Sequence, residues 1–92
     1  MNFSLDYDGT YDADPEFWLQ FVKDAQKNGD NVYVVTERSL DESEDIDPEL
    51  VKLCHVIACN GAAKKDVTEQ LGIDIDIWID NKPKRIYKSK DE

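Results

Sequence analysis

The sequence predicts an α/β fold, a three-layer Rossmann-like sandwich with helices on both faces of a mainly parallel sheet of four to five strands. Short apolar runs rich in β-branched residues alternate with segments whose apolar residues recur every three or four positions. Residues that start and stop helices separate the two kinds of segment. Strands joined through helices pair in parallel with right-handed crossovers. A length of 92 residues leaves room for one core, so we expect a single domain, 1–92.

The first half of the chain contains two predicted strands and one helix. The first strand is expected at 2–6. A helix then begins at Asp14 and Pro15, because aspartate is a good N-cap and proline suits the first helical turn. This helix ends before Gly29, which suits a left-handed C-terminal cap. The run 32–35, Val-Tyr-Val-Val, lacks polar alternation, which predicts a strand covered on both faces.

An acidic segment, 39–47, follows the second strand. It has no apolar periodicity, and we expect a solvated loop there. Pro48 opens a short helix that is predicted to reach about His55. The apolar run 56–59 is then the third buried strand.

The last part of the chain contains one more helix and one more strand. The helix is predicted over 62–71, where inward residues lie four apart and Gly72 supplies the cap. The fourth strand is expected at 73–79. The segment 83–92 is a basic tail that we expect to be partly flexible, with a short edge strand at 85–87.

The net charge of −10 and a pI near 4.4 exclude general affinity for nucleic acid or for an anionic membrane, because both would be repelled. No apolar run approaches the roughly 20 residues that span a bilayer, and the N-terminus lacks a signal-peptide pattern. Cys54 and Cys59 do not have the spacing of a four-ligand zinc site and are expected to be reduced core thiols. We therefore expect a cytoplasmic protein.

Polar side chains follow every predicted strand. They are Asp6 and Asp8 after the first strand, Thr36 after the second, Lys64 in the helix after the third, and Asp80 after the fourth. Taken alone, the Asp-Tyr-Asp-Gly stretch is better interpreted as a surface turn. The carboxyl ends of parallel strands meet at one edge of a sheet, however, where such folds bind ligands. Carboxylates bind Mg²⁺, and a hydroxyl and an ammonium suit phosphate oxygens, so the set predicts a phosphoryl-transfer site.

These residues resemble the motifs of the haloacid dehalogenase-like (HAD) superfamily of phosphohydrolases. The resemblance runs from residue 2 to about 83 and points to a minimal, capless member. The four matching motifs are Asp6-Tyr7-Asp8-Gly9-Thr10, Val34-Val35-Thr36, Lys64, and Trp78-Ile79-Asp80-Asn81. The first is fairly specific after a strand, and the order and spacing of the others add to it.

The resemblance implies a Mg²⁺-dependent phosphatase that hydrolyses a phosphate monoester through an aspartyl-phosphate. Asp6 would be the nucleophile and Asp8 the general acid and base. Thr36 would bind a phosphate oxygen, and Lys64 would offset negative charge. The metal would be held by Asp6, Asp80 and the backbone carbonyl of Asp8. Contacts with the phosphate are expected at Asp6, Tyr7, Asp8, Thr36, Glu37 and Lys64.

Three features of this chain shape the expected site. Lys64 shares the inward stripe of its predicted helix, whereas Lys65 turns toward solvent, so Lys64 is the preferred phosphate lysine. Asn81 stands where the family often has a second acid, which removes one negative charge near the ion. Only the acidic loop 39–47 is available as a lid, so we expect an open site.

An open site leaves the substrate and the partners undecided. The resemblance allows a phosphorylated small molecule or the terminal phosphate of a macromolecule, and also a homo-oligomer whose neighbouring subunit covers the site. Members of the family commonly carry a flap after the first motif, but here only residues 11–14 separate Thr10 from the first helix. This missing flap and Asn81 motivate an alternative, a HAD-fold binding or regulatory protein with weak catalysis. A third alternative is an inert structural domain.

Overall fold

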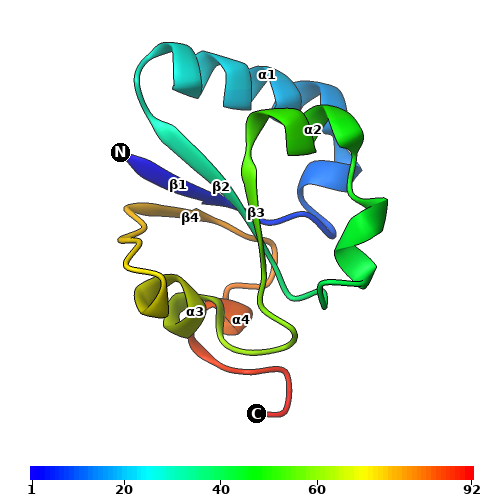
Figure 1. Cartoon of the computed structure of the whole chain (residues 1–92), viewed down its shortest axis with the longest axis vertical. Coiled ribbons are helices and arrows are strands. Elements are labelled where there is room, and N and C mark those ends of the chain that lie inside the picture. The colour runs from blue at the N-terminus through cyan, green and yellow to red at the C-terminus, as the bar shows by residue number, and fades with distance from the viewer.

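The computed structural model describes all residues, 1–92, and confirms the predicted α/β fold. A single four-stranded sheet runs through the molecule with the strand order β3-β2-β1-β4, and every pair of neighbouring strands is parallel (Figure 1). The strands are β1 (Asn2–Leu5), β2 (Asn31–Thr36), β3 (His55–Ala58) and β4 (Ile77–Ile79).

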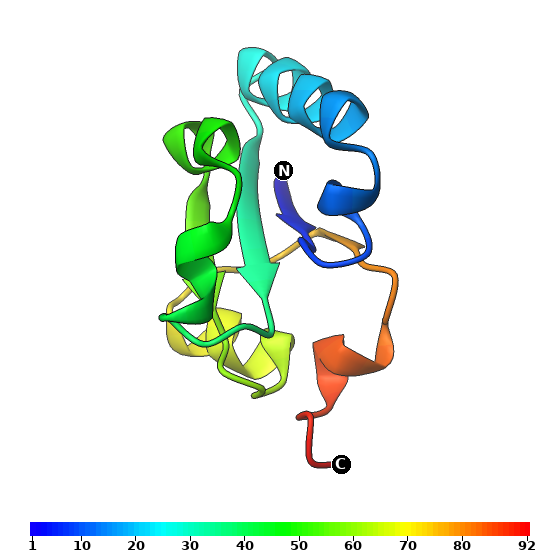
Figure 2. The same cartoon turned by 90° about the vertical axis from the view of Figure 1, so that its right-hand side faces the viewer.

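The helices cover both faces of this sheet. In two perpendicular views α1 and α2 lie on one side of the strands, and α3 and α4 lie on the other (Figures 1 and 2). Two short 3-10 helices occupy the loops that follow β1 and β2. The bounds are α1 (Pro15–Lys27), α2 (Pro48–Leu53), α3 (Lys64–Gln70), α4 (Lys84–Tyr87), η1 (Tyr11–Ala13) and η2 (Glu42–Asp45). No helix is long and apolar enough to cross a membrane.

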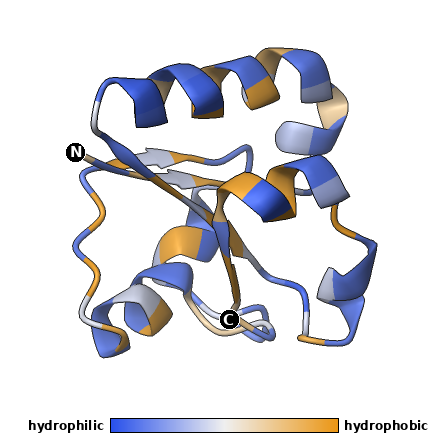
Figure 3. Cartoon of the chain, turned by 45° about the horizontal axis from the view of Figure 1, so that its top comes forward, coloured by the Kyte–Doolittle hydropathy of each residue, from blue (hydrophilic) through white to orange (hydrophobic).

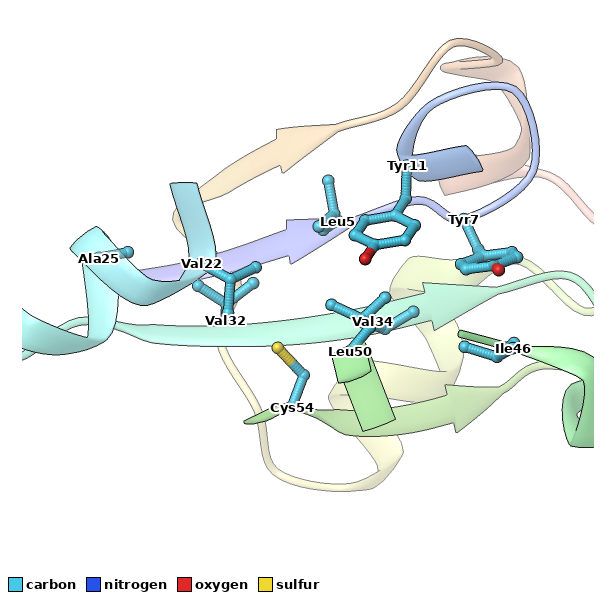
Figure 4. Packing of buried hydrophobic residues seen from close by; sticks show 10 residues of the cluster. All are labelled: Leu5, Tyr7, Tyr11, Val22, Ala25, Val32, Val34, Ile46, Leu50 and Cys54. Atoms are coloured by element: carbon cyan, nitrogen blue, oxygen red, sulfur yellow. The ribbon is translucent and has the colours of Figure 1, made fainter. Parts of the chain in front are cut away.

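Side chains of β2 alternate between two cores, as the pleat of a strand requires. Val32 and Val34 belong to the larger cluster, which fills the space between the sheet and α1 and α2 (Figure 4). Val35 belongs to a smaller cluster with Ile57, against which Val67 of α3 packs. A strand with apolar residues on both faces is therefore buried on both, which explains the continuous apolar run in the sequence.

The outer surface of α1 is polar, as its periodicity predicts. Figure 3 shows a largely hydrophilic helix with hydrophobic turns between the polar ones. Val22 and Ala25 are the buried residues of α1, whereas Phe17 remains exposed.

Two predictions about the last part of the chain are wrong. Residues 73–76 are not part of β4: the side chain of Asn2 donates to the carbonyl of Asp74 (2.8 Å), and the carboxylate of Asp76 accepts from the backbone nitrogen of Asn2 (2.7 Å). Between this segment and β1 only one backbone hydrogen bond forms, from the nitrogen of Asp76 to the carbonyl of Asn2 (2.8 Å), so the ladder is not continuous there. The predicted edge strand at 85–87 is helical, because α4 packs against α3 and buries Ile86. The sheet therefore has four strands and not five.

The tail after α4 is fixed to the loops at the carboxyl edge of the sheet. The backbone nitrogen of Lys90 donates to the carbonyl of Gly61 (2.7 Å). Within α4, Arg85 forms an ion pair with Glu37 (3.6 Å), which follows β2. This basic segment therefore lies beside the strand ends that carry the candidate site.

Candidate functional site

Three buried charged side chains meet where β1 and β4 end. Asp6 follows β1, and its backbone nitrogen donates to the carbonyl of Ile79 (2.9 Å), so the pairing of the two strands continues to this residue. Asp80 follows β4 directly, and Lys64 is the first residue of α3. The Lys64 Nζ atom lies 2.7 Å from Asp6 Oδ1 and 2.6 Å from Asp80 Oδ2. The ammonium group thus bridges both carboxylates.

The bridge is almost fully enclosed. Side-chain exposure is 1% for Lys64, 7% for Asp6 and 3% for Asp80. Burial opposes the charge of Lys64, but its hydrogen bonds to the two carboxylates outweigh burial and raise its pKa above the usual value. Burial raises the pKa of the Asp6 carboxyl, against the opposing effect of Lys64. Buried charges rarely stabilise a fold better than apolar residues would, which makes this cluster a candidate functional site.

The turn after Asp6 is held by its own polar groups. The Thr10 hydroxyl donates to Asp6 Oδ2 (3.1 Å), and the backbone nitrogen of Gly9 donates to the carboxylate of Asp12 (2.7 Å). Gly9 has a φ of +83°, in the left-handed region that favours glycine. The stretch that could be read as a simple turn is therefore a turn built around the Asp6 carboxylate.

Asp8 points to a different partner, Arg38. The guanidinium group binds the carboxylate through two hydrogen bonds, Nε to Oδ2 (2.9 Å) and Nη2 to Oδ1 (2.7 Å). This pair lowers the pKa of Asp8, so the carboxyl is held in its charged form. Arg38 also donates to the carbonyl of Glu42 (2.9 Å) and lies 5.2 Å above the ring of Tyr7. It therefore connects the loop after β1 with the acidic loop after β2.

Sequence reasoning missed the role of Arg38. The one available signal was its place two residues after Thr36, at the same edge of the sheet as the other candidates. Its partners Asp8 and Tyr7 lie about thirty positions away in the sequence, and no local pattern relates them.

A small pocket of about 40 Å³ opens between these groups. Its lining contains four acidic residues and one lysine: Asp6, Asp8, Glu37, Asp80 and Lys82. Such a volume holds a few water molecules or an ion. The loop 39–47 contributes nothing to this lining, so it does not cover the pocket as a lid in this conformation.

Three other candidate residues, Thr36, Tyr7 and Lys65, do not line the pocket. Thr36 is fully buried, and its hydroxyl accepts a hydrogen bond from the backbone nitrogen of Arg38 (3.2 Å), so it does not line the pocket. The Tyr7 ring stacks on Tyr11 in the core, 5.4 Å between centroids. Lys65 is exposed on α3 and does not reach the site. Of the two lysines, only Lys64 joins the cluster.

The oxygen atoms here have the chemistry that Mg²⁺ prefers. The expected donors are the carboxylates of Asp6 and Asp80 and the carbonyl of Asp8, a set of hard oxygens beside the pocket. No three acidic side chains converge on one point. The fit to the ion therefore depends on two carboxylates and one backbone carbonyl. Protein donors satisfy these oxygens in this conformation; Asp80 Oδ1, for example, accepts from the backbone nitrogen of Lys82 (2.9 Å). The residues fit the ion by donor type.

Comparison of the chain with protein-family models, with curated proteins and with solved structures found no match.

Proposed function

We propose that this chain is a capless HAD-like phosphohydrolase that cleaves phosphate monoesters with the help of Mg²⁺. The observation that carries the proposal is the buried bridge from Lys64 to Asp6 and Asp80 at the carboxyl ends of two neighbouring parallel strands. Ligands of open α/β sheets bind at this edge, where the strand order changes direction. A nucleophile, a cation and a second acid stand there together beside a pocket.

Asp6 is the proposed nucleophile. One of its carboxylate oxygens attacks the phosphorus atom, the bond from phosphorus to the ester oxygen breaks, and the leaving alkoxide takes a proton from Asp8. The product of this step is an aspartyl-phosphate on Asp6. Its carboxylate is held in place by Lys64 and by Thr10, so the attacking group is already oriented.

Asp8 acts again in the second half of the reaction. As a carboxylate it takes a proton from the attacking water, the bond between Asp6 and phosphorus breaks, and phosphate leaves with Asp6 restored. The pair with Arg38 keeps Asp8 charged, which suits this second role. To serve as the acid in the first step, Asp8 has to separate from Arg38 and take up a proton from water, which it then passes to the leaving alkoxide.

The charge of the substrate is offset from two sides. Lys64 is fixed beside Asp6, and Lys82 lines the pocket next to Asp80. Mg²⁺, when bound by Asp6, Asp80 and the carbonyl of Asp8, supplies a positive charge that neutralises the phosphoryl oxygens. Because the pocket is small and uncovered, it takes the phosphoryl end while the rest of the substrate stays outside. This allows a small molecule or the terminal phosphate of a macromolecule.

The test is phosphate release from p-nitrophenyl phosphate with and without MgCl₂. We expect Mg²⁺-dependent turnover in the wild type and a loss on the order of 10⁶-fold in Asp6→Asn, as for another removed nucleophile. Asp66→Asn, an exposed aspartate on α3, is the matched control and should retain activity. Acid quenching followed by mass spectrometry should find the phosphoryl group on the peptide that contains Asp6. Wild-type turnover in Asp6→Asn would refute the mechanism.

Two observations favour a second candidate, a binding or regulatory protein that has kept the fold. Asp8 is engaged by Arg38, and Thr36 is buried away from the pocket. This candidate predicts that phosphate analogues bind without any hydrolysis across a broad panel of phosphate esters. Turnover that disappears in Asp6→Asn would exclude it.

The proposed compartment is the cytoplasm. Cys54 and Cys59 are unpaired and buried, as expected in a reducing environment.

A further inference from the structure

The side chain of Asn81 lies against the turn that carries Asp6. One amide atom is 2.8 Å from Asp6 Oδ2 and 3.2 Å from the backbone carbonyl of Asp8. Both neighbours are acceptors, so the atom that faces them is the nitrogen, which donates to both. The amide therefore joins the loop after β4 to two residues of the first motif, Asp6 and Asp8.

These two acceptors are also two of the three oxygens that are proposed to hold Mg²⁺. The amide is the third donor to the Asp6 carboxylate: Lys64 binds Oδ1, and Thr10 and Asn81 both bind Oδ2. An NH₂ group carries partial positive charge and can donate to two oxygens at once. It can therefore hold the two oxygens together, as a bound cation would. A carboxylate at position 81 could not do so, because it only accepts hydrogen bonds.

The turn is shaped around this amide. A Cβ atom at Gly9 would collide with the side-chain amide of Asn81. Gly9 therefore serves two purposes, the left-handed backbone and the close approach of the amide. The side-chain amide of Asn81 therefore packs directly against the backbone of the first motif.

We infer that Asn81 is a positioning residue that holds the Asp6 turn in place of a divalent cation, and that Mg²⁺ binds there only when the amide turns away. The role of the ion rests on the proposed function; the role of the amide in the metal-free chain does not. Two consequences follow. An acid at position 81 should weaken the metal-free fold, and it should bind Mg²⁺ at least about tenfold more tightly, because it adds a charged ligand and removes a competing donor.

The experiment compares wild type, Asn81→Asp and Asn81→Ala, with Gln70→Glu as a control that adds a charge at an exposed position of α3. Thermal unfolding is measured in EDTA and in MgCl₂, and Mg²⁺ affinity is measured by calorimetry. In EDTA both Asn81 variants should melt below wild type, Asn81→Asp the lower of the two, and Gln70→Glu should not. Mg²⁺ should raise the melting temperature of Asn81→Asp to that of wild type or above.

Two results would overturn the inference. The first is that Asn81→Asp and Asn81→Ala melt at the same temperature as wild type in EDTA. The second is weaker Mg²⁺ binding in both Asn81 variants than in wild type, since the amide oxygen would then be a ligand.

The proposed function can fail separately. If Mg²⁺ stabilises only Asn81→Asp and the wild type releases no phosphate, the inference stands and the Mg²⁺-dependent reaction does not. If Asp6→Asn abolishes turnover while Asn81→Asp behaves as wild type in both buffers, the reaction stands and the inference does not.

Discussion

Lys64→Met tests how much the buried bridge of Lys64 contributes to the free energy of unfolding. Methionine keeps the apolar stem but removes the ammonium that lies 2.7 Å from Asp6 and 2.6 Å from Asp80. The two buried carboxylates then lack a cation between them, although Thr10 still donates to Asp6 and the backbone nitrogen of Lys82 to Asp80. Breaking a buried ion pair from one side costs about 3–5 kcal/mol, because the remaining charge keeps its desolvation penalty.

That loss is large for a chain of 92 residues. At ~0.05–0.15 kcal/mol per residue, its free energy of unfolding should be about 5–14 kcal/mol. A loss of 3–5 kcal/mol corresponds to a decrease in Tm of roughly 12–40 °C, at about 4–8 °C per kcal/mol for a domain of this size. The variant should keep a free energy of unfolding of about 0–11 kcal/mol at 25 °C.

The assay is urea unfolding in metal-free buffer, followed by circular dichroism and by tryptophan fluorescence. Lys65→Met is the matched control: this neighbour is half exposed and its Nζ atom lies 3.9 Å from Glu69, a surface pair worth under about 0.5 kcal/mol. Adding Asp6→Asn to Lys64→Met should recover part of the loss, because only one buried carboxylate then lacks a counter-ion. A Lys64→Met variant within about 1 kcal/mol of Lys65→Met would refute the reasoning.

Three further predictions concern the turn, the core and the thiols. Gly9→Ala should destabilise the fold more than Gly72→Ala; both residues have positive φ (+83° and +75°), but only a Cβ at Gly9 meets another side chain. Tyr11→Phe should lower the free energy of unfolding by about 1.5 kcal/mol, since it removes a 2.8 Å hydrogen bond to the N-cap carboxylate of α2. Burial raises the pKa of Cys54 and of Cys59 from 9.0 to about 11, so stability should decrease as the pH rises from 9 to 11.

The sign of the thiol effect follows from proton binding. Between pH 9 and 11 the unfolded thiols lose their protons while the folded ones retain them, and the unfolded state gains stability. Unfolding of a Cys54→Ala, Cys59→Ala double variant should depend less on pH in this window, and an unchanged slope would contradict the assignment.

The other two predictions have controls of their own. Tyr33→Phe is the control for Tyr11→Phe, because the Tyr33 hydroxyl makes no hydrogen bond, and equal losses in the two variants would contradict the prediction for Tyr11. Equal losses of unfolding free energy in Gly9→Ala and Gly72→Ala would contradict the prediction for Gly9, because the turn would then have room for a side chain.

The parts of the fold that could be predicted are those with a local physical cause. The continuous apolar run in β2 and the Asp-Pro start of α1 were sufficient to place those elements. The facing of Lys64 followed from its spacing to Val67 along one helix. Leu71, which was expected on the same inward face, is instead exposed at the end of α3. Each of these patterns lies within a few residues of the chain.

The errors and omissions arose where a distant partner decides the outcome. The alternating Ile-Asp segment 73–76 has a strand pattern, but it forms only one backbone hydrogen bond to β1, and its other bonds to Asn2 involve side chains. The segment 85–87 is helical because α3 covers it. In the candidate site, the pairing of Arg38 with Asp8 and the contact of Asn81 with the first motif join residues about thirty and seventy positions apart, which no periodicity describes.

The lining of the pocket has a consequence for the rate at which ions arrive. Four of its five residues are acidic, and the whole chain carries a net charge of −10. At low ionic strength this field slows the approach of any anion and raises the local concentration of cations. The Debye length shortens from about 30 Å at 0.01 M salt to about 10 Å at 0.1 M, so added salt should accelerate the encounter with a phosphate ester and slow the capture of Mg²⁺. Varying KCl at constant substrate would separate the two steps, because they respond to screening in opposite directions.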